Sequence, residues 1–369
     1  MVDLRARWLR LPHGNLRRML AALPLALLVS ACDTPPTKPP APEPKAAVVA
    51  PAAPSPEKVA ERARRAALRE LVALQDRLYR VTAPLLINNS ALCPNPHNLL
   101  GFSAKNKYSY PTDFIDGAQQ DLGLDEQLQV TGVMPGSGAA KAGVQVGDKL
   151  VAINGVAIPA GDNAEHRASM ELANIVRKRN VVNLMIDRKG ASISLNVPLT
   201  RACAYVVDLG NTERVGAYAD GRHVLVTRGM LKAAASDDEL AYVLATEMAR
   251  NALRQSDKLH TTDVAAQIID NLTQLHPDPA KLPNAATPKL STPELDIAAD
   301  RRGLYMAARA GFEVARAGRF VERLAIDYPS ADADSYTAIH PIGDERLAAI
   351  ARTVGEIKAK QAGNKPLTP

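Results

Sequence analysis

The stretch VMPGSGAAKAGVQVGDKLVAING, residues 133–155, carries the clearest pattern of local structure in the chain. Alternating apolar residues at Leu128 and Val130 lead into it as a strand, and a Pro-Gly turn then opens a short alanine-rich helix that Gly143 ends. A second strand follows and turns at Asn154-Gly155, a pair typical of tight hairpins because both residues accept positive φ. This order predicts a small β-rich domain.

The flanking sequence extends that domain to residues 98–200. Residues 164–179 read as a helix, and residues 182–186 and 193–197 read as a closing hairpin around Arg188-Lys189-Gly190. The whole unit resembles a PDZ domain. The resemblance implies peptide binding, in which a peptide adds as a strand to a sheet edge and a loop of backbone N–H groups holds its terminal carboxylate.

The segment Leu99-Leu100-Gly101-Phe102 resembles that carboxylate-binding loop. A competing segment, Leu122-Gly123-Leu124, lies nearer the next strand but follows a polar, helix-like stretch, so we prefer the first. The preferred assignment inserts about 25 residues between the groove strand and the next strand, and we expect them to cover part of the groove. An alternative remains that these glycines only make turns.

The sequence after Cys203 has a different character. Residues 206–209 and 224–227 read as strands, the bend between them spans residues 217–221, and a helix starts at Asp237. This order resembles the HtpX-type zinc metalloproteases, peptidase family M forty-eight, in the branch of periplasmic lipoproteins that carry a PDZ domain. The resemblance covers roughly residues 71–369. It rests also on the blocks DIAADRRGLY (296–305), ARAGF (308–312) and HPIGDER (340–346).

The resemblance implies an α+β fold. A mainly helical metalloprotease-like domain with a small sheet, residues 201–369, would be interrupted in the chain by a PDZ β-sandwich or barrel. Residues 57–97 would form an N-terminal helix that packs on the protease-like domain. This helix starts at Ser55-Pro56, carries apolar residues at spacings of three and four, and is expected to end by Pro84.

The metal-binding motif of that family is degenerate here. The family motif His-Glu-x-x-His grips Zn²⁺ with two imidazoles, and its glutamate activates the metal-bound water. In this chain the motif reads Thr246-Glu247-Met248-Ala249-Arg250, and the third ligand position holds Asp296. Threonine is a poor zinc ligand and arginine offers no lone pair. We therefore expect no metal cofactor, with Arg250 replacing the metal as a structural counter-charge.

Three residues remain as catalytic candidates by resemblance. Glu247 occupies the general-base position, His340 the position of a histidine close to the metal, and Arg346 that of an arginine near the substrate cleft. With Asp296 and Glu247, His340 could offer only a weak oxygen-rich site. Simple packing of His340 beside Pro341, and a surface ion pair for Arg346, are the alternatives.

The N-terminal segment predicts export. Five arginines precede an apolar stretch of residues 19–31 that is too short to span a bilayer, and Leu28-Val29-Ser30-Ala31-Cys32 resembles a lipobox. We expect a signal peptide at 1–31, lipidation of Cys32 and a tether at 32–56, where residues 33–56 hold nine prolines. An ordinary signal peptide is the alternative. Localisation would be periplasm-facing, anchored to the inner or outer membrane.

Charge and cysteine content narrow the remaining choices. The chain has 369 residues and a net charge of +6, most of it in the signal segment, so no basic face for nucleic acid is expected. Cys93 and Cys203 either form a disulfide, which an exported compartment permits, or remain separate buried thiols.

Together these features predict an envelope lipoprotein that is a catalytically inactive pseudoprotease. It would bind peptides or unfolded protein segments in envelope quality control, or pair with an active protease relative. Two alternatives stay open: an active zinc-dependent metalloendopeptidase, with zinc as cofactor, and a structural scaffold.

Overall fold

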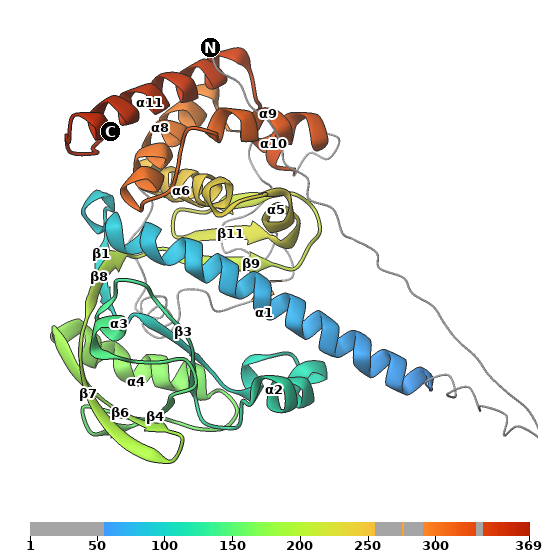
Figure 1. Ribbon diagram of the computed structural model, residues 1–369, viewed down its shortest axis with the longest axis vertical. Helices are drawn as coiled ribbons and strands as arrows, with labels where there is room; N and C mark the ends of the chain where they lie inside the picture. The colour runs from blue at the N-terminus through green and yellow to red at the C-terminus, as the bar shows by residue number, and fades with distance from the viewer. Residues whose placement is uncertain (1–54, 255–274, 277–290, 330–334) are drawn as a thin grey trace, which may run out of the picture. The chain divides into compact units, whose positions relative to one another are not determined.

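The computed structural model describes residues 55–254, 275–276, 291–329 and 335–369 (Figure 1). The predicted signal peptide, lipidated Cys32 and all but the last two residues of the tether lie outside the described residues. Among the residues that the structure describes, no helix is both long and apolar enough to span a membrane.

The first element is the long helix α1, Pro56–Asn88. Ser55 caps it, because its Oγ accepts a hydrogen bond from the Lys58 N–H at 3.4 Å. The expected end before Pro84 is wrong, since the helix continues through the proline for one more turn. A proline inside a helix costs about 3 kcal/mol. The complete burial of Leu85 and Leu86, worth about 1.5–3 kcal/mol each, offsets that cost.

The PDZ-like region is a sheet in the order β2-β3-β4-β6-β7, with β5 paired to β4. Neighbouring strands are antiparallel throughout. Its apolar core lies between the sheet and the helix α4. The strands are β2 (Phe102–Lys105), β3 (Gln129–Val133), β4 (Lys149–Ile153), β5 (Val156–Ala157), β6 (Val181–Arg188) and β7 (Ala191–Pro198), and the helices are α3 (Gly138–Ala142) and α4 (Ala164–Lys178).

The insertion after β2 folds into short helices. They are η2 (Lys107–Ser109), η3 (Thr112–Phe114) and α2 (Ile115–Leu122). Arg65 of α1 donates to the Asp121 carboxylate with its Nε at 2.8 Å, so the insertion is held against the long helix.

A two-stranded ladder forms the entry and exit of the PDZ-like region. It follows the short helix η1 (Ser90–Leu92) and consists of β1 (Pro96–Leu99) and β8 (Thr200–Cys203), with Pro96 opposite Cys203. The structure joins Cys93 and Cys203 in a disulfide, with Cα atoms 5.5 Å apart. The bond therefore closes a loop that contains the whole PDZ-like region.

The remaining residues form a second sheet with helices beside it. Its strand order is β10-β11-β9-β12; β11 and β12 are parallel to β9, whereas β10 is antiparallel to β11. The expected bend at residues 217–221 contains a strand, β10. The elements are β9 (Val206–Gly210), β10 (Ala217–Ala219), β11 (His223–Thr227), β12 (Leu275–His276), α5 (Arg228–Ala233), α6 (Asp237–Arg254), α8 (Pro293–Arg309), α9 (Ala317–Asp327), α10 (Tyr336–Ile339) and α11 (Asp344–Ala362).

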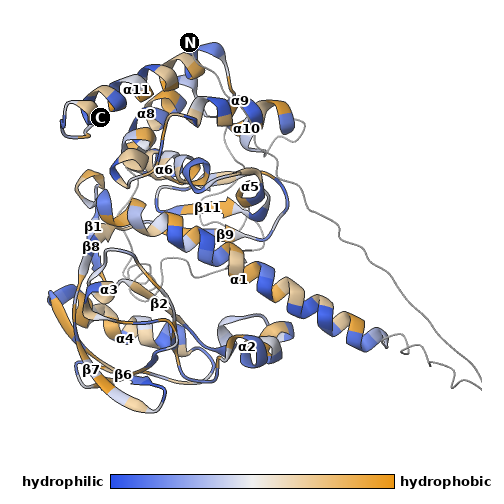
Figure 2. Ribbon diagram, viewed as in Figure 1, coloured by the Kyte–Doolittle hydropathy of each residue, from blue (hydrophilic) through white to orange (hydrophobic). Residues whose placement is uncertain are grey.

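The helix α6 is the centre of this second half. Twelve consecutive residues, 240–251, are buried, and α6 packs against α8 (Figure 2). Gly303 of α8 permits this approach, because a Cβ there would lie 2.8 Å from the Thr246 backbone. Segregated sheets and helices with two separate cores confirm the predicted α+β class.

Candidate functional site

The first candidate site is the outer edge of β2. Within the described part of the chain, β2 pairs with β3 on one side and stands last in its sheet. Phe102 and Ala104 point into the apolar core shared with α4, whereas Ser103 and Lys105 line a cavity on the opposite face. An edge strand of this kind presents backbone N–H and C=O groups to any extended chain that reaches it.

The loop before β2 is held by its backbone. The Gly101 carbonyl accepts hydrogen bonds from the Met134 N–H at 2.9 Å and from the Ser137 hydroxyl at 3.1 Å. Gly101 has a φ of +89°, and a Cβ at this position would lie 2.6 Å from the Ser137 Cβ. Only glycine therefore fits the loop.

The structure places all four predicted loop residues together at the start of β2. Leu99, Leu100 and Phe102 are nevertheless fully buried, so their side chains belong to the cores rather than to an open surface. The competing Gly123 ends α2 with a left-handed φ of +68°. Its role is helix termination.

Hydrogen bonds at the two ends of α4 show how this helix lies relative to the Gly101 loop and the insertion. At the carboxyl end, the Asn98 amide of β1 donates to the Arg179 carbonyl at 3.5 Å, which places this end beside the Gly101 loop. At the amino end, Asn106 donates to the Gly161 carbonyl at 2.8 Å, and the Ser109 hydroxyl donates to the Glu165 carboxylate at 2.9 Å. The insertion therefore contacts the amino end of α4, which is distant from the Gly101 loop.

The second candidate site is a buried ionic cluster between α6, α8 and the chain after α10. Arg250 donates from Nε to Glu247 Oε1 at 3.1 Å, and from Nη1 to Asp296 Oδ1. His340 Nδ1 lies 3.1 Å from the same Asp296 oxygen, and its Nε2 lies 3.7 Å from Glu247 Oε1. Each of these side chains, with Thr246, is no more than 4% exposed.

A second ion pair continues the cluster. Arg346 makes a two-pronged contact with Asp300, from Nε at 2.7 Å and from Nη2 at 3.1 Å, and the Tyr242 hydroxyl donates to the same carboxylate at 2.8 Å. Arg346 also donates to the His340 carbonyl at 2.9 Å. The alternative that Arg346 makes a surface ion pair is wrong, because the side chain is only 4% exposed.

The charges in the cluster set the protonation of its members. Burial favours the neutral form of Asp296, but the hydrogen bond from His340 and the charge of Arg250 outweigh it and lower the pKa of that carboxyl. Burial, with the nearby charge of Arg250, lowers the pKa of His340, so its imidazole is neutral at pH 7. Asp296 is therefore an anion that faces a cationic guanidinium and a neutral imidazole.

The cluster does not suit a zinc ion. The guanidinium of Arg250 lies between Glu247 and Asp296, the two carboxylates that would have to face a metal. Across residues 55–254, 275–276, 291–329 and 335–369, no group of three His, Cys, Asp or Glu side chains has an arrangement that could hold a metal ion. The residues present thus do not fit the metal that the metalloprotease resemblance implies.

Sequence reasoning missed several members of this cluster. Asp300 lies within a block that the resemblance quoted, but its pairing with Arg346 depends on the packing of α11 against α8. The rings of Tyr336 and His340 pack at a tilt of 58° with centroids 5.0 Å apart, and the Ser291 hydroxyl accepts a hydrogen bond from Arg250 at 3.3 Å. No local sequence signal identifies these contacts.

Comparison with known proteins identifies one part of the chain. The family model of the PDZ domain matches residues 129–174, so the region around β3 to α4 is a PDZ domain. No curated protein matches the chain.

Solved structures that are similar include the HtrA3 PDZ domain bound to a phage-derived ligand, at 19% identity and a TM-score of 0.21, over 29% of this chain and 88% of that chain. The HtrA-type protease AlgW with a decapeptide is similar at 22% identity and a TM-score of 0.22, over 29% of this chain and 30% of that one. A variant of AlgW, AlgWS227A with a decapeptide, is similar at 19% identity and a TM-score of 0.21, over 32% of this chain and 33% of that one.

Proposed function

We propose that this chain binds the carboxyl-terminal end of an extended peptide at the outer edge of β2, beside α4. The observation that carries the proposal is the position of β2 at the end of the PDZ sheet, paired on one side within the described residues. A peptide strand would pair with that edge, and main-chain hydrogen bonds would supply affinity that depends little on sequence.

The loop at Gly101 supports recognition of a terminal carboxylate. Its carbonyl is fixed by Met134 and Ser137, so the loop is rigid before any ligand arrives. A preformed loop loses little conformational entropy on binding. Because the insertion follows β2 directly and is hydrogen-bonded to the amino end of α4, the peptide would occupy only the short span of β2, Phe102–Lys105.

We further propose that the helical half acts as a binding or scaffolding body without proteolytic activity. The support is the guanidinium of Arg250 between Glu247 and Asp296, which occupies the space where a protease of the resembled family would need a metal. Export and anchoring through a lipidated Cys32 would place the peptide-binding domain at a bacterial envelope membrane, in quality control of unfolded segments.

A titration of fluorescent decapeptides tests the peptide proposal. A peptide that ends in an apolar residue with a free carboxylate should bind the full-length protein, and its carboxamide should bind at least about tenfold more weakly because a charge-assisted contact is lost. Equal affinity of both peptides would show that the Gly101 loop does not hold the carboxylate.

Two glycine-to-alanine variants distinguish a specific effect at the Gly101 loop from a general effect of backbone strain. Gly101→Ala brings a Cβ against Ser137, whereas Gly190→Ala has a similar positive φ of +83° and open space around it. Peptide binding is compared for the folded fraction of each variant, measured by circular dichroism, and only Gly101→Ala should weaken it. Charged substitutions at Leu100 or Phe102 are unsuitable because both side chains are buried in the core.

Metal analysis of the purified protein tests the inactive core. We expect less than about a tenth of an equivalent of zinc after dialysis against a weak chelator, since arginine cannot act as a ligand. One tightly held equivalent, with chelator-sensitive cleavage of denatured casein, would establish the active metalloendopeptidase instead.

A further inference from the structure

The PDZ sheet has a second edge, β7, at the opposite end of the strand order from β2. Figure 1 shows β7 at the outer margin of the sheet, and among the described residues it pairs with β6 alone. Its eight residues, Ala191–Pro198, carry no charge, and its ladder with β6 runs without a bulge. Edge strands usually carry charges, internal prolines or bulges that prevent pairing with another chain. The interior of β7 has none of these.

The backbone of β7 has hydrogen-bonding groups that β6 does not use. Next to the ladder, the Leu199 N–H donates to the Asn180 carbonyl at 2.8 Å. In an antiparallel ladder every second residue bonds to the neighbouring strand, and the residues between direct their N–H and C=O groups to the other side. By this alternation in the β6–β7 register, the outward-facing residues are Ser192, Ser194 and Asn196. They present a row of donors and acceptors to a further strand.

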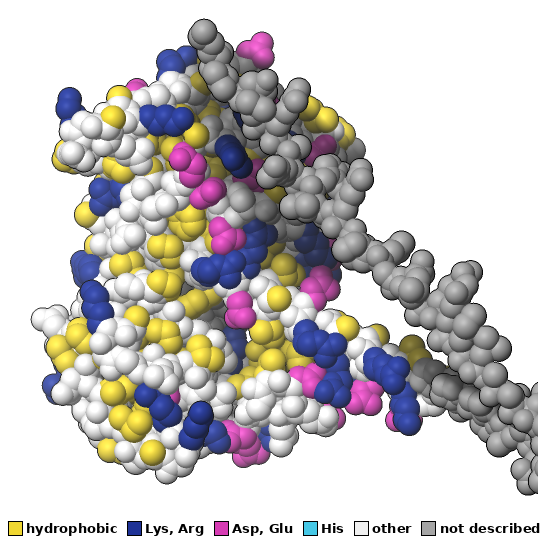
Figure 3. Space-filling view, viewed as in Figure 1, with side chains coloured by type: hydrophobic (Ala, Val, Ile, Leu, Met, Phe, Trp, Pro, Cys, Tyr) yellow, Lys and Arg dark blue, Asp and Glu magenta, His cyan; other side chains and the backbone are white. Residues whose placement is uncertain are grey.

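Apolar side chains at this end of the sheet are incompletely covered. Ile193 and Leu195 of β7 pack against the PDZ core but are only partly buried. On the other face of the sheet, Val181 and Met185 of β6 are 49% and 38% exposed. Figure 3 shows hydrophobic side chains at the surface in this region. A strand placed beside β7 would remove part of this apolar surface from water.

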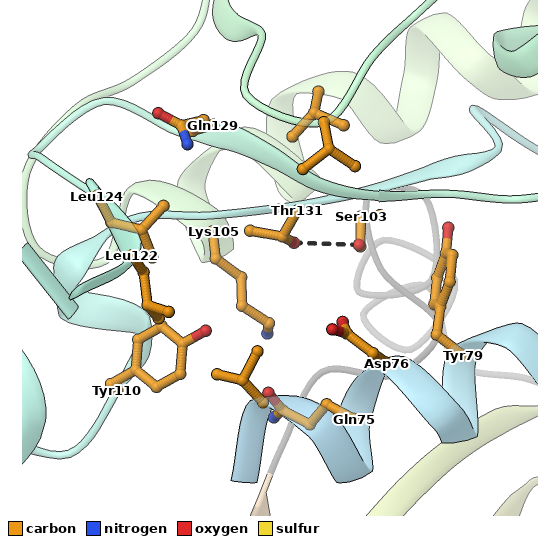
Figure 4. Close-up of a pocket in the computed structure, with 14 residues that line it drawn as sticks. Gln75, Asp76, Tyr79, Ser103, Lys105, Tyr110, Leu122, Leu124, Gln129 and Thr131 are labelled. Carbon is orange, nitrogen blue, oxygen red and sulfur yellow. Dashed lines mark hydrogen bonds between the residues drawn. The ribbon is translucent and has the colours of Figure 1, made fainter. Parts of the chain in front are cut away.

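That outer face is covered at the other end of the sheet. There α1 lies against β2 and β3, and Figure 4 shows Asp76 and Tyr79 of α1 beside Ser103 and Thr131, whose hydroxyls are 3.1 Å apart. Lys105 lines the cavity between them and already has an interaction partner, as Tyr79 does. The chain thus covers the β2–β3 end with its own helix, whereas apolar side chains stay exposed at the β6–β7 end.

The packing of α3 limits which part of β7 another strand could reach. Gly138 of α3 lies so close to the Pro198 carbonyl that a Cβ on this glycine would be 1.7 Å from the oxygen. The edge is therefore occupied by α3 at its carboxyl end. Residues 190–196 remain for pairing, and Ile193 lies at their centre.

We propose that a second copy of this chain pairs with β7 through its own β7, antiparallel and about a twofold axis at Ile193. In this register Ser192 of one copy faces Ser194 of the other, and the two exchange both main-chain hydrogen bonds because both direct these groups outward. The two Ile193 side chains face each other, and Ala191 faces Leu195. Apolar residues thus meet apolar residues on one face of the joined sheet.

The charge pattern favours a second copy as the partner. An antiparallel pair of identical strands is twofold symmetric, so a charge near the axis would face its own copy. Residues 190–196 hold no charge, and the cationic Arg188 and Lys189 lie in the hairpin turn, beyond the paired residues. Because β2 is at the other end of each sheet, the dimer leaves both β2 edges in place.

Sedimentation velocity of the full-length protein between about 1 and 100 µM tests the proposal. We expect a dimer that dissociates on dilution. Ser194→Pro removes an outward N–H and no bond to β6, so it should raise the dimer dissociation constant at least about tenfold. Ser194→Ala keeps that N–H and should dimerise like the wild type. A monomer at about 100 µM, or a folded Ser194→Pro variant that dimerises as tightly as the wild type, would overturn the proposal.

Disulfide cross-linking locates the axis, and it decides the matter if circular dichroism shows that Ser194→Pro does not fold. Directly opposite residues in a non-hydrogen-bonded pair have Cα atoms about 4.5 Å apart, within reach of a disulfide. Ile193→Cys should therefore give a covalent dimer on non-reducing electrophoresis. Ser192→Cys should not, because its two copies would be offset by about 7 Å along the strands. Cross-linking of neither variant, or equal cross-linking of both, would contradict this interface.

Discussion

The PDZ domain and the helical half of this chain use polar groups in opposite ways. In the PDZ domain the core is apolar, and the open hydrogen-bonding capacity lies in the backbone of the edge strand β2. In the helical half the chemically capable side chains are in the core, where Arg250 pairs with one oxygen each of Glu247 and Asp296, while Glu247 Oε2, Asp296 Oδ2 and Arg250 Nη2 lack a hydrogen-bond partner among the described residues. The difference teaches that reactive residue types do not by themselves mark a working site, because a buried guanidinium between two carboxylates stands where a ligand would have to bind them.

Breaking the buried cluster should have the largest effect. Arg250→Met leaves Glu247 and Asp296 buried without their cation, and removal of one partner of a buried ion pair costs about 3–5 kcal/mol. Urea denaturation followed by circular dichroism should show this loss in the free energy of unfolding. A loss below about 1 kcal/mol would mean that the guanidinium does not serve as the counter-charge.

The control for that variant is an exposed pair on neighbouring helices. Arg301 donates to Glu356 at 2.7 Å, but both side chains are more than 40% exposed. Arg301→Ala should change the free energy of unfolding by less than about 1 kcal/mol, because water and salt screen the pair.

Removing the disulfide should cause the next largest loss of unfolding free energy. It tests how much the link between the two ends of the PDZ-containing loop contributes to stability. The Cys93–Cys203 bond joins residues 110 apart and thereby closes the loop that holds the PDZ domain. The Cys93→Ala/Cys203→Ala variant should lose about 2–5 kcal/mol of unfolding free energy. Wild-type protein measured with a reducing agent should reproduce that loss. Equal stability of the oxidised protein and the variant would contradict this role.

A pH effect at the β1–β8 ladder should be somewhat smaller. Burial, helped by the charge of Arg201, lowers the pKa of His97 to about 4. Between pH 6.5 and about 4, His97 is protonated in the unfolded chain but stays neutral in the folded chain. The free energy of unfolding therefore decreases as the pH falls through this range. We expect His97 to lower the free energy of unfolding by about 2–3 kcal/mol over this pH range.

Two histidine variants check that pH effect by urea denaturation at each pH. His97→Gln should flatten the stability profile over this window, leaving the contribution of His340, whose pKa is lowered as well. His166→Gln, at an exposed position of α4, should keep the wild-type profile. An unchanged profile in His97→Gln would contradict the assignment.

The local parts of the fold could be predicted from the sequence because they depend on neighbouring residues. Asn154 and Gly155 adopt the expected positive φ values of +49° and +80°, and Gly143 ends α3 with a φ of +84°. The hairpin at Lys189-Gly190 also occurs where expected. In each case the turn chemistry alone decides the conformation.

Features that depend on tertiary packing could not be predicted. The passage of α1 through Pro84 requires the burial of Leu85 and Leu86, which no local pattern reveals. The sequence indicated that Arg250 could serve as a counter-charge, but the pairing of Arg346 with Asp300 depends on the packing of α11 against α8. The cavity beside Lys105 likewise depends on how the insertion and α1 meet the sheet.

Hydrogen–deuterium exchange with and without a carboxyl-terminal peptide tests the central claim most directly. If the peptide pairs with the outer edge of β2, the amides of this strand, Phe102–Lys105, should exchange more slowly in its presence, while those of residues 246–250 in α6 should not change. Protection confined to α6 and α8, with unchanged exchange in β2, would contradict the account and return the binding function to the helical half.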